Sequence, residues 1–293
     1  MLIDRIGSDD RRHEIDGRAA RPLVGGVPGG GSALYGGALL RPSREDFVPG
    51  RHYGERIPRA IWEWPFGYDE LAPYYGQAED LLGVCGDAEA DTPHLARRGR
   101  PYRSASPPLD PFSEELARGL ESAGATPFRL PLAIDFDRCQ RCPRCPGYVC
   151  PTGARTSTES HLLAPREGKG LLDRWHGMEV EQIVSSRTGP VGLRLRDRRL
   201  GRAHLVTAEH CLLAAGAIGT PLLLEHSALA AESGELGRNH MCHLGALAVA
   251  LFAQPIGADT TFLKRIGLSD DYLGTPGYGE KLGSAQVIPI PGV

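Results

Sequence analysis

The sequence contains no run of 18 apolar residues, so we expect no membrane-spanning helix. It also lacks an excess of positive charge: 33 Lys and Arg stand against 36 Asp and Glu. That balance gives no sign of a nucleic-acid-binding surface. The first residues, MLIDRIGSDDRRHEIDG, lack the apolar core of a secretory leader, and we therefore expect a cytoplasmic protein.

The composition that is present is typical of a globular protein. The chain has 293 residues, of which 41% are hydrophobic and 24% charged, enough to bury the core of one or two domains. Seven cysteines occur, and four of them are crowded into Cys139–Cys150. An odd number without a leader indicates a reducing compartment, where clustered cysteines favour metal or redox chemistry over disulfides.

The spacing of apolar residues predicts two helices and a set of strands. Helical spacing occurs over Asp69–Leu82 and Ser113–Ala123, with Asp69 and Ser113 as the expected N-caps. Alternation predicts antiparallel strands at Glu179–Ser185, Val191–Arg196 and His204–Thr207.

A second pattern is typical of an α/β unit. The fully apolar strand Cys211–Ala215 precedes a small-residue turn, Gly216–Gly219, and a helix, Pro221–His226. Small residues at the end of such a strand leave room for a cofactor, although close helix–strand packing would suit them equally well. A further apolar strand is expected at Ala246–Phe252.

The glycine-rich segment GGVPGGGSALYGG, Gly25–Gly37, is a candidate ligand-binding loop. Glycines let the backbone approach a ligand closely, so that its amides can line a phosphate or a ring edge. A glycine-rich loop by itself is equally typical of a flexible turn. The sequence around it adds specificity, because WPFGYDELAPYYGQAEDLLGVCG follows at Trp64–Gly86.

Together these segments resemble the glucose–methanol–choline (GMC) family of FAD-dependent oxidoreductases. Trp64–Gly86 matches the family's helix motif almost position by position. Ala208–Ser227 resembles its second signature, and Glu235–His243 resembles the segment that enters its substrate-binding half. The resemblance implies an α/β fold: an incomplete FAD-binding, Rossmann-like domain with part of an antiparallel-sheet substrate domain.

The resemblance also implies an activity and a set of cofactor contacts. Members of the family oxidise CH–OH groups of alcohols or sugars by hydride transfer to the flavin. The positions of this sequence that match their FAD contacts are Gly29, Gly30, Gly31, Ser32, Tyr35, Val180, Ala215, Gly216 and Ala217. Tyr35 resembles the aromatic residue of a gluconate- and pyranose-oxidising branch, and Leu34 replaces the histidine that attaches flavin covalently in some of that branch.

The match covers only the middle of the family. The GxGxxG unit with which members of the family begin is not found before Gly25. The sequence after His243 contains no histidine that could serve as the catalytic base. We therefore expect a fragment or split subunit, completed by a chain that supplies the missing segments, and we assign no catalytic residue. The alternatives are a non-catalytic assembly or binding partner and an iron–sulfur electron-transfer module.

The matched regions suggest three parts. Residues 1–135 would carry the flavin-contacting loop and the lid of the FAD domain. Residues 136–230 would carry the cysteine-rich loop, hairpins and second FAD segment, and residues 231–293 the start of the substrate-binding domain.

The cysteine-rich loop has the spacing C-x2-C-x2-C-x4-C-P, with Cys139, Cys142, Cys145 and Cys150 as candidate metal ligands. This differs from the bacterial ferredoxin run by one residue in the last gap. Zinc sites usually separate two C-x2-C pairs by a longer loop, so zinc fits less well. The sequence leaves open an iron–sulfur cluster or a loop of free, packed thiols.

Overall fold

The computed structural model describes residues 13–15, 18–20, 25–90, 92–142, 145–184, 191–229, 234–238, 240–241, 245–253 and 263–289. Contacts divide the chain into two compact units, one made of residues 1–171 and 252–293 and the other of residues 172–251. The three parts expected from the sequence were divided by function rather than by contacts, and they stay predictions.

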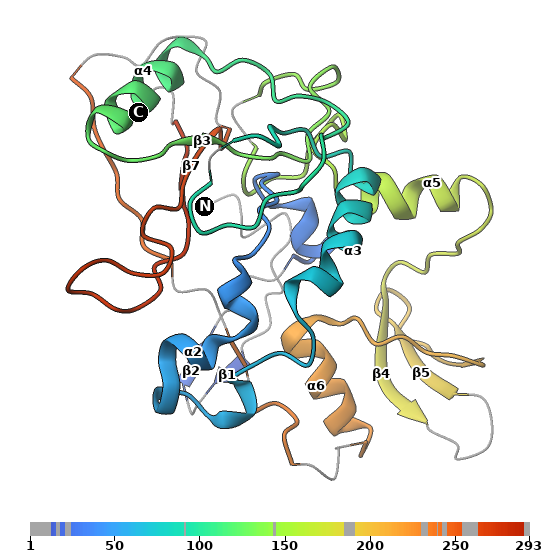
Figure 1. Cartoon of the computed structure of the whole chain (residues 1–293). Helices are drawn as coiled ribbons and strands as arrows, with labels where there is room; N and C mark the ends of the chain where they lie inside the picture. The colour runs from blue at the N-terminus through green and yellow to red at the C-terminus, as the bar shows by residue number, and fades with distance from the viewer. Residues whose placement is uncertain are drawn as a thin grey trace. The chain divides into compact units, whose positions relative to one another are not determined.

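The first unit contains two long helices, α3 (Tyr68–Leu81) and α4 (Pro111–Ser122), joined by extended loops (Figure 1). Its short helical segments are 3-10 turns at Gly30–Ala33, Arg44–Phe47, Gly54–Arg56 and Arg59–Ile61, α2 (Pro49–Tyr53), a π-helical turn at Glu159–Leu163, and α5 (Ala164–Glu167). Among the described residues, none of the helices is long and apolar enough to cross a membrane.

Both predicted helices form, but their N-caps differ from those predicted. Helix α3 begins after Gly67, whose backbone N–H donates to the Glu70 carboxylate at 3.0 Å. Helix α4 begins after Asp110, whose carboxylate accepts from the backbone N–H of Ser113 at 3.0 Å. Each cap lies upstream of the residue we expected. At α4 the Asp110 carboxylate satisfies a free N–H group of the first turn, whereas Gly67 offers no side-chain acceptor and is held only by its own N–H bond to Glu70.

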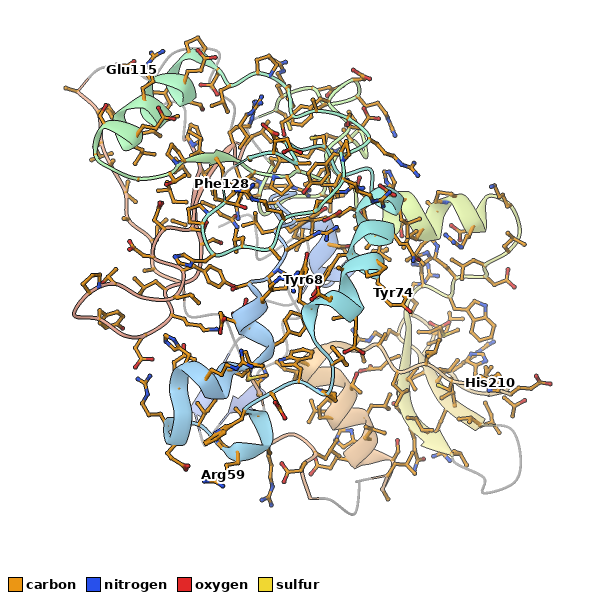
Figure 2. All side chains as sticks on the ribbon, viewed as in Figure 1. Arg59, Tyr68, Tyr74, Glu115, Phe128 and His210 are labelled. Carbon is orange, nitrogen blue, oxygen red and sulfur yellow. The ribbon has the colours of Figure 1, made fainter. Side chains whose placement is uncertain are left out.

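The inner face of α3 is partly polar. Tyr68 (labelled in Figure 2) and Glu79 are buried, whereas Tyr74 is exposed. Glu79 accepts two hydrogen bonds from the Arg41 guanidinium, at 2.7 and 2.8 Å, and Arg41 also donates to the Tyr68 hydroxyl at 2.9 Å. The helix is therefore held by a buried ion pair as well as by apolar packing.

Two small antiparallel sheets belong to this unit. Strands β1 (His13–Ile15) and β2 (Arg18–Ala20) form a hairpin in a region where the sequence predicted no element. Strand β7 (Ile266–Leu268) pairs with β3 (Phe128–Arg129) and β8 (Ala285–Val287), as Figure 1 shows for β3 and β7. The core behind this sheet consists of Cys85, Phe128, Leu130, Leu132, Ile134 and Leu263.

The second unit confirms the three predicted antiparallel strands. They are β4 (Met178–Val184), β5 (Val191–Asp197) and β6 (Ala203–Ala208), with β5 in the centre (Figure 1). Helix α6 (Gly216–His226) packs on β4, and the Ser227 hydroxyl accepts a hydrogen bond from the backbone N–H of Ile183 at 2.8 Å.

Two strand predictions are wrong. Cys211–Ala215 and Ala246–Phe252 are both irregular, and Leu212, Leu247 and Leu251 are exposed. An apolar strand is stable only when neighbouring strands satisfy its backbone groups, and no described strand pairs with either segment. The predicted turn Gly216–Gly219 is instead the first turn of α6.

Candidate functional site

The glycine-rich loop Gly25–Gly37 closes tightly on itself. A side chain at Gly25 would lie 2.4 Å from the carbonyl carbon of Gly30, so a residue with a Cβ does not fit there. Gly29 and Gly30 have φ values of 88° and 54°, in the left-handed region that favours glycine. The loop therefore depends on glycine for two separate reasons, close approach and backbone conformation.

The other side of the loop is open. Among the residues that the structure describes, none lies within 4 Å of a Cβ built on Gly30 or Gly31, and Gly31 is exposed. Gly31 does not have a positive φ, so neither conformation nor packing within this chain accounts for glycine at that position. Exposed backbone of this kind can approach the flavin or pyrophosphate of FAD closely, and so the loop fits the cofactor that the sequence predicts.

A polar segment at residues 155–160 supports the loop from beneath. The Ser32 hydroxyl accepts from the backbone N–H of Thr158 at 3.0 Å, and the Tyr35 hydroxyl donates to the Thr156 carbonyl at 2.8 Å. A Cβ on Gly29 would lie 3.1 Å from Glu159. The predicted contacts Ser32 and Tyr35 thus fix the shape of the loop.

Arg155 ties the glycine-rich loop to the cysteine-rich loop. It is only 2% exposed, and its Nη2 donates to the Ala33 carbonyl at 2.5 Å and to the Tyr148 carbonyl. Its Nη1 lies 3.8 Å from Cys145 Sγ, and its guanidinium lies over the Tyr35 ring. The sequence analysis gave this residue no role, because its place at the end of the cysteine motif is the only signal that it carries in the sequence.

Burial controls the ionisation of the groups around Arg155. Burial raises the pKa of Tyr35 to about 12 against the opposing charge of Arg155, so the phenol remains protonated at neutral pH. Burial likewise raises the pKa of Cys145 to about 11. It also acts on Cys150, but hydrogen bonds from Arg155 and Thr152 outweigh it and lower the pKa of that thiol.

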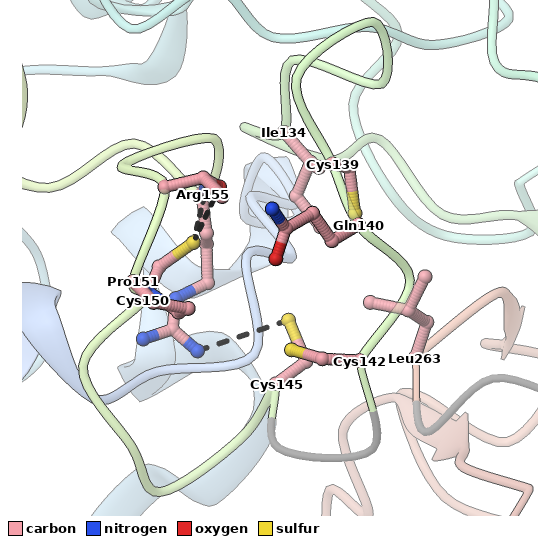
Figure 3. A pocket seen from close by; sticks show the side chains of 10 residues that line it. Ile134, Cys139, Gln140, Cys142, Cys145, Cys150, Pro151, Arg155 and Leu263 are labelled. Carbon is pink, nitrogen blue, oxygen red and sulfur yellow. Dashed lines mark hydrogen bonds between the residues drawn. The ribbon is translucent and has the colours of Figure 1, made fainter.

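The four cysteines line one cavity, together with Arg155 (Figure 3). The cavity measures about 20 Å³, room for about one water-sized sphere. Within the described ranges, no three His, Cys, Asp or Glu side chains are placed to hold a metal ion. The structure therefore brings the predicted ligands to one cavity, and their role as metal ligands stays a prediction.

The remaining predicted contacts lie in the second unit. Val180 is partly exposed on β4 at an irregularity in its pairing with β5. Ala215, Gly216 and Ala217 form the exposed start of α6, where free backbone N–H groups favour anions. His243, which the sequence placed in a family segment, lies outside the described residues.

Comparison with known proteins places this geometry in a family context. Residues 14–245 match the family model described as GMC oxidoreductase. The chain is 34% identical over 206 residues to 6'''-hydroxyparomomycin C oxidase of Streptomyces lividus, covering 68% of this chain and 37% of that protein. Paromamine 6'-oxidase of Streptomyces fradiae is 32% identical, over 68% of this chain and 36% of its own length.

Two further similarities are more distant. The fructose dehydrogenase large subunit of Gluconobacter japonicus is 26% identical over 67% of this chain and 38% of its own length. An FAD-dependent oxidoreductase structure from Chaetomium thermophilum aligns with 78% of this chain and 39% of its own length, at a TM-score of 0.50 and 16% identity. The fold is therefore shared, and the chain spans little more than a third of the length of these relatives.

Proposed function

Because the chain belongs to the GMC oxidoreductase family, we propose that it forms the flavin-contacting part of an FAD-dependent oxidoreductase acting on a CH–OH group of an alcohol or sugar. The observation that carries the proposal is the open backbone of Gly30 and Gly31, on a loop held rigidly from the other side. The names of the relatives, which include oxidases and a dehydrogenase, support oxidation as the reaction class.

FAD, when bound, supplies the hydride acceptor for such a reaction. The residues of this chain would bind and orient it: the backbone of Gly29–Ser32 would lie against the cofactor, on a loop that Arg155 fixes through the Ala33 carbonyl. Val180 and Ala215–Ala217 complete the proposed contacts by family resemblance. We assign no general base to this sequence, and we propose that segments outside it, on the same or a complementary chain, supply the base and the dinucleotide-binding unit.

The test is a Gly31→Ala substitution. In this chain a Cβ at position 31 meets nothing within 4 Å, so the unfolding midpoint stays unchanged. In the presence of FAD the methyl group occupies the space of the cofactor, and we expect at least a tenfold loss of affinity, about 1.4 kcal/mol. Gly119→Ala is the matched control. A Cβ at Gly119 also has no neighbour within 4 Å among the described residues, and Gly119 lies in α4, outside the glycine-rich loop.

The measurement is FAD titration followed by flavin fluorescence. The chain is titrated alone and after co-expression with a segment that carries a GxGxxG unit and a C-terminal histidine. We expect weak or no retention of FAD by the chain alone and stoichiometric FAD in the reconstituted sample. In the reconstituted sample, equal FAD affinity of the Gly31→Ala and Gly119→Ala proteins would contradict the assignment of the loop.

The convergence of four thiols on one cavity favours a second candidate, an iron–sulfur electron-transfer module. In the present arrangement the cavity is too small for a cluster, so no step of the proposed reaction passes through one. Iron and acid-labile sulfide analysis of anaerobically prepared, reconstituted protein decides the question. Several irons per chain would establish the cluster, and FAD-loaded protein without iron would leave the loop as structure alone. A non-catalytic binding role would show as reconstituted protein that holds FAD but oxidises no alcohol or sugar.

A further inference from the structure

A second cavity, of about 30 Å³, lies in the first unit apart from the glycine-rich and cysteine-rich loops. Its wall includes Arg41, Arg98, Thr92 and Tyr102, beside apolar residues such as Leu95 and Pro131. The volume admits about two water-sized spheres, which excludes a nucleotide or a sugar but admits an ion of one or a few atoms.

Arg98 is the central residue of this cavity. Its side chain is 1% exposed, and the central carbon of its guanidinium lies over the Tyr102 ring, 4.4 Å from the ring centroid. Nη2 donates to Asp80 at 2.5 Å, and Nε lies 3.2 Å from Glu79, too poorly aligned to form a hydrogen bond. Nη1 has no hydrogen-bond acceptor in the described part of the chain. A buried charged N–H group without an acceptor is costly, so the site favours a negatively charged occupant.

The balance of charge points the same way. Within the described residues, four guanidinium groups contact only two carboxylates, those of Glu79 and Asp80, so positive charge is in excess in this cluster. The four groups belong to Arg41, Arg98, Arg100 and, at 3.9 Å from Asp80, Arg103. Another pair on the cavity wall, Arg129 and Asp87, adds no net charge, because a guanidinium and a carboxylate of opposite charge lie 3.5 Å apart.

We propose that this cavity is a binding site for a small monovalent inorganic anion, with the Arg98 guanidinium as its principal donor. Thr92 and Tyr102 also line the cavity, and each carries a hydroxyl that is suited to donate a further hydrogen bond to the anion. Chloride has the appropriate charge and size class. The anion would stabilise the fold around α3 independently of any flavin.

The test uses the full chain and halide salts. Thermal unfolding is recorded across a chloride or bromide titration, with methanesulfonate, which is too large for the cavity, maintaining constant ionic strength. We expect a saturable rise in the midpoint of about 3 °C with halide. In crystals grown with bromide, an anomalous peak should lie within hydrogen-bond distance of Arg98 Nη1.

Variants separate the site from general salt effects. Arg98→Met removes the proposed principal donor and one positive charge, and it should abolish the halide-dependent rise. Replacing the exposed Arg59 (labelled in Figure 2) with Gln should retain the rise. If Arg98→Met does not fold, Thr92→Val should weaken the halide response, and the bromide peak in the unaltered chain remains decisive. Identical unfolding in halide and methanesulfonate, or a water in place of bromide, overturns the proposal.

Discussion

Replacing Glu79 with glutamine removes the carboxylate that faces two buried guanidinium groups. Arg41 is 5% and Arg98 1% exposed, so water cannot replace the lost charge on either. Burial alone would lower the pKa of Arg41, but hydrogen bonds to Glu79 and Tyr68 raise it above its usual value. The variant loses the Glu79 contribution, yet Arg41 stays charged because a guanidinium group is not deprotonated in proteins at neutral pH. Removing one partner of a buried ion pair typically destabilises a protein by about 3–5 kcal/mol.

An exposed pair in the same unit provides the control. Arg44 and Asp69 form the same two-pronged contact, with both bonds at 2.6 Å, but their side chains are 59% and 77% exposed. Water and salt screen such a pair, so Asp69→Asn should leave the stability almost unchanged.

The assay is urea unfolding followed by circular dichroism and tryptophan fluorescence. Glu79→Gln should shift the midpoint strongly without changing the slope, which reports the surface exposed on unfolding. If the two variants unfold at the same urea concentration, burial does not determine the strength of the Arg41–Glu79 pair, and the reasoning fails.

Two further predictions concern titrating groups. The pKa of Cys150 is lowered and that of Cys145 is raised to about 11, so iodoacetamide at pH 8 should label Cys150 well before Cys145 in metal-free protein. Peptide mass spectrometry gives the order of labelling. The reverse order would show that the hydrogen bond from the Arg155 backbone N–H does not stabilise the Cys150 thiolate. Burial raises the pKa of Asp270, but hydrogen bonds from Thr126 outweigh this effect and lower the pKa below its usual value. The ionised Asp270 carboxylate therefore stabilises the fold above about pH 4, and this stabilisation is lost as the pH falls below that range. Asp270→Asn should therefore cost about 1 kcal/mol at pH 7 and little at pH 2, and a cost that does not change with pH would refute the assignment.

The sequence predicted local structure well where a short window contained the cause. The antiparallel strands β4 to β6 follow from alternation within neighbouring segments. Helix α3 (Tyr68–Leu81) follows from the helical spacing over Asp69–Leu82. The wrong strand at Cys211–Ala215 shows the limit of that reasoning, because an apolar run indicates burial but does not supply the partner strands that a buried strand needs.

The candidate site was predictable only in part. The glycine-rich loop was found because close backbone approach has a direct signature in composition, and the family match identifies the cofactor. Arg155 donates to Ala33, which lies 122 positions away in the sequence, and Arg41 pairs with Glu79, which lies 38 positions away. No local pattern encodes such contacts, since each side chain is ordinary within its own segment.

The exposed segment Ala246–Ala253 has a practical consequence for preparing the protein. It reads ALAVALFA, with no charge and no proline, and its leucines and its valine are turned to solvent. Short uncharged stretches of this kind pair readily with their own copies as β-strands and thereby seed aggregates. Concentrated preparations of this chain should therefore self-associate through this stretch, and a single lysine in place of Val249 should keep the protein dispersed at concentrations where the unaltered chain precipitates.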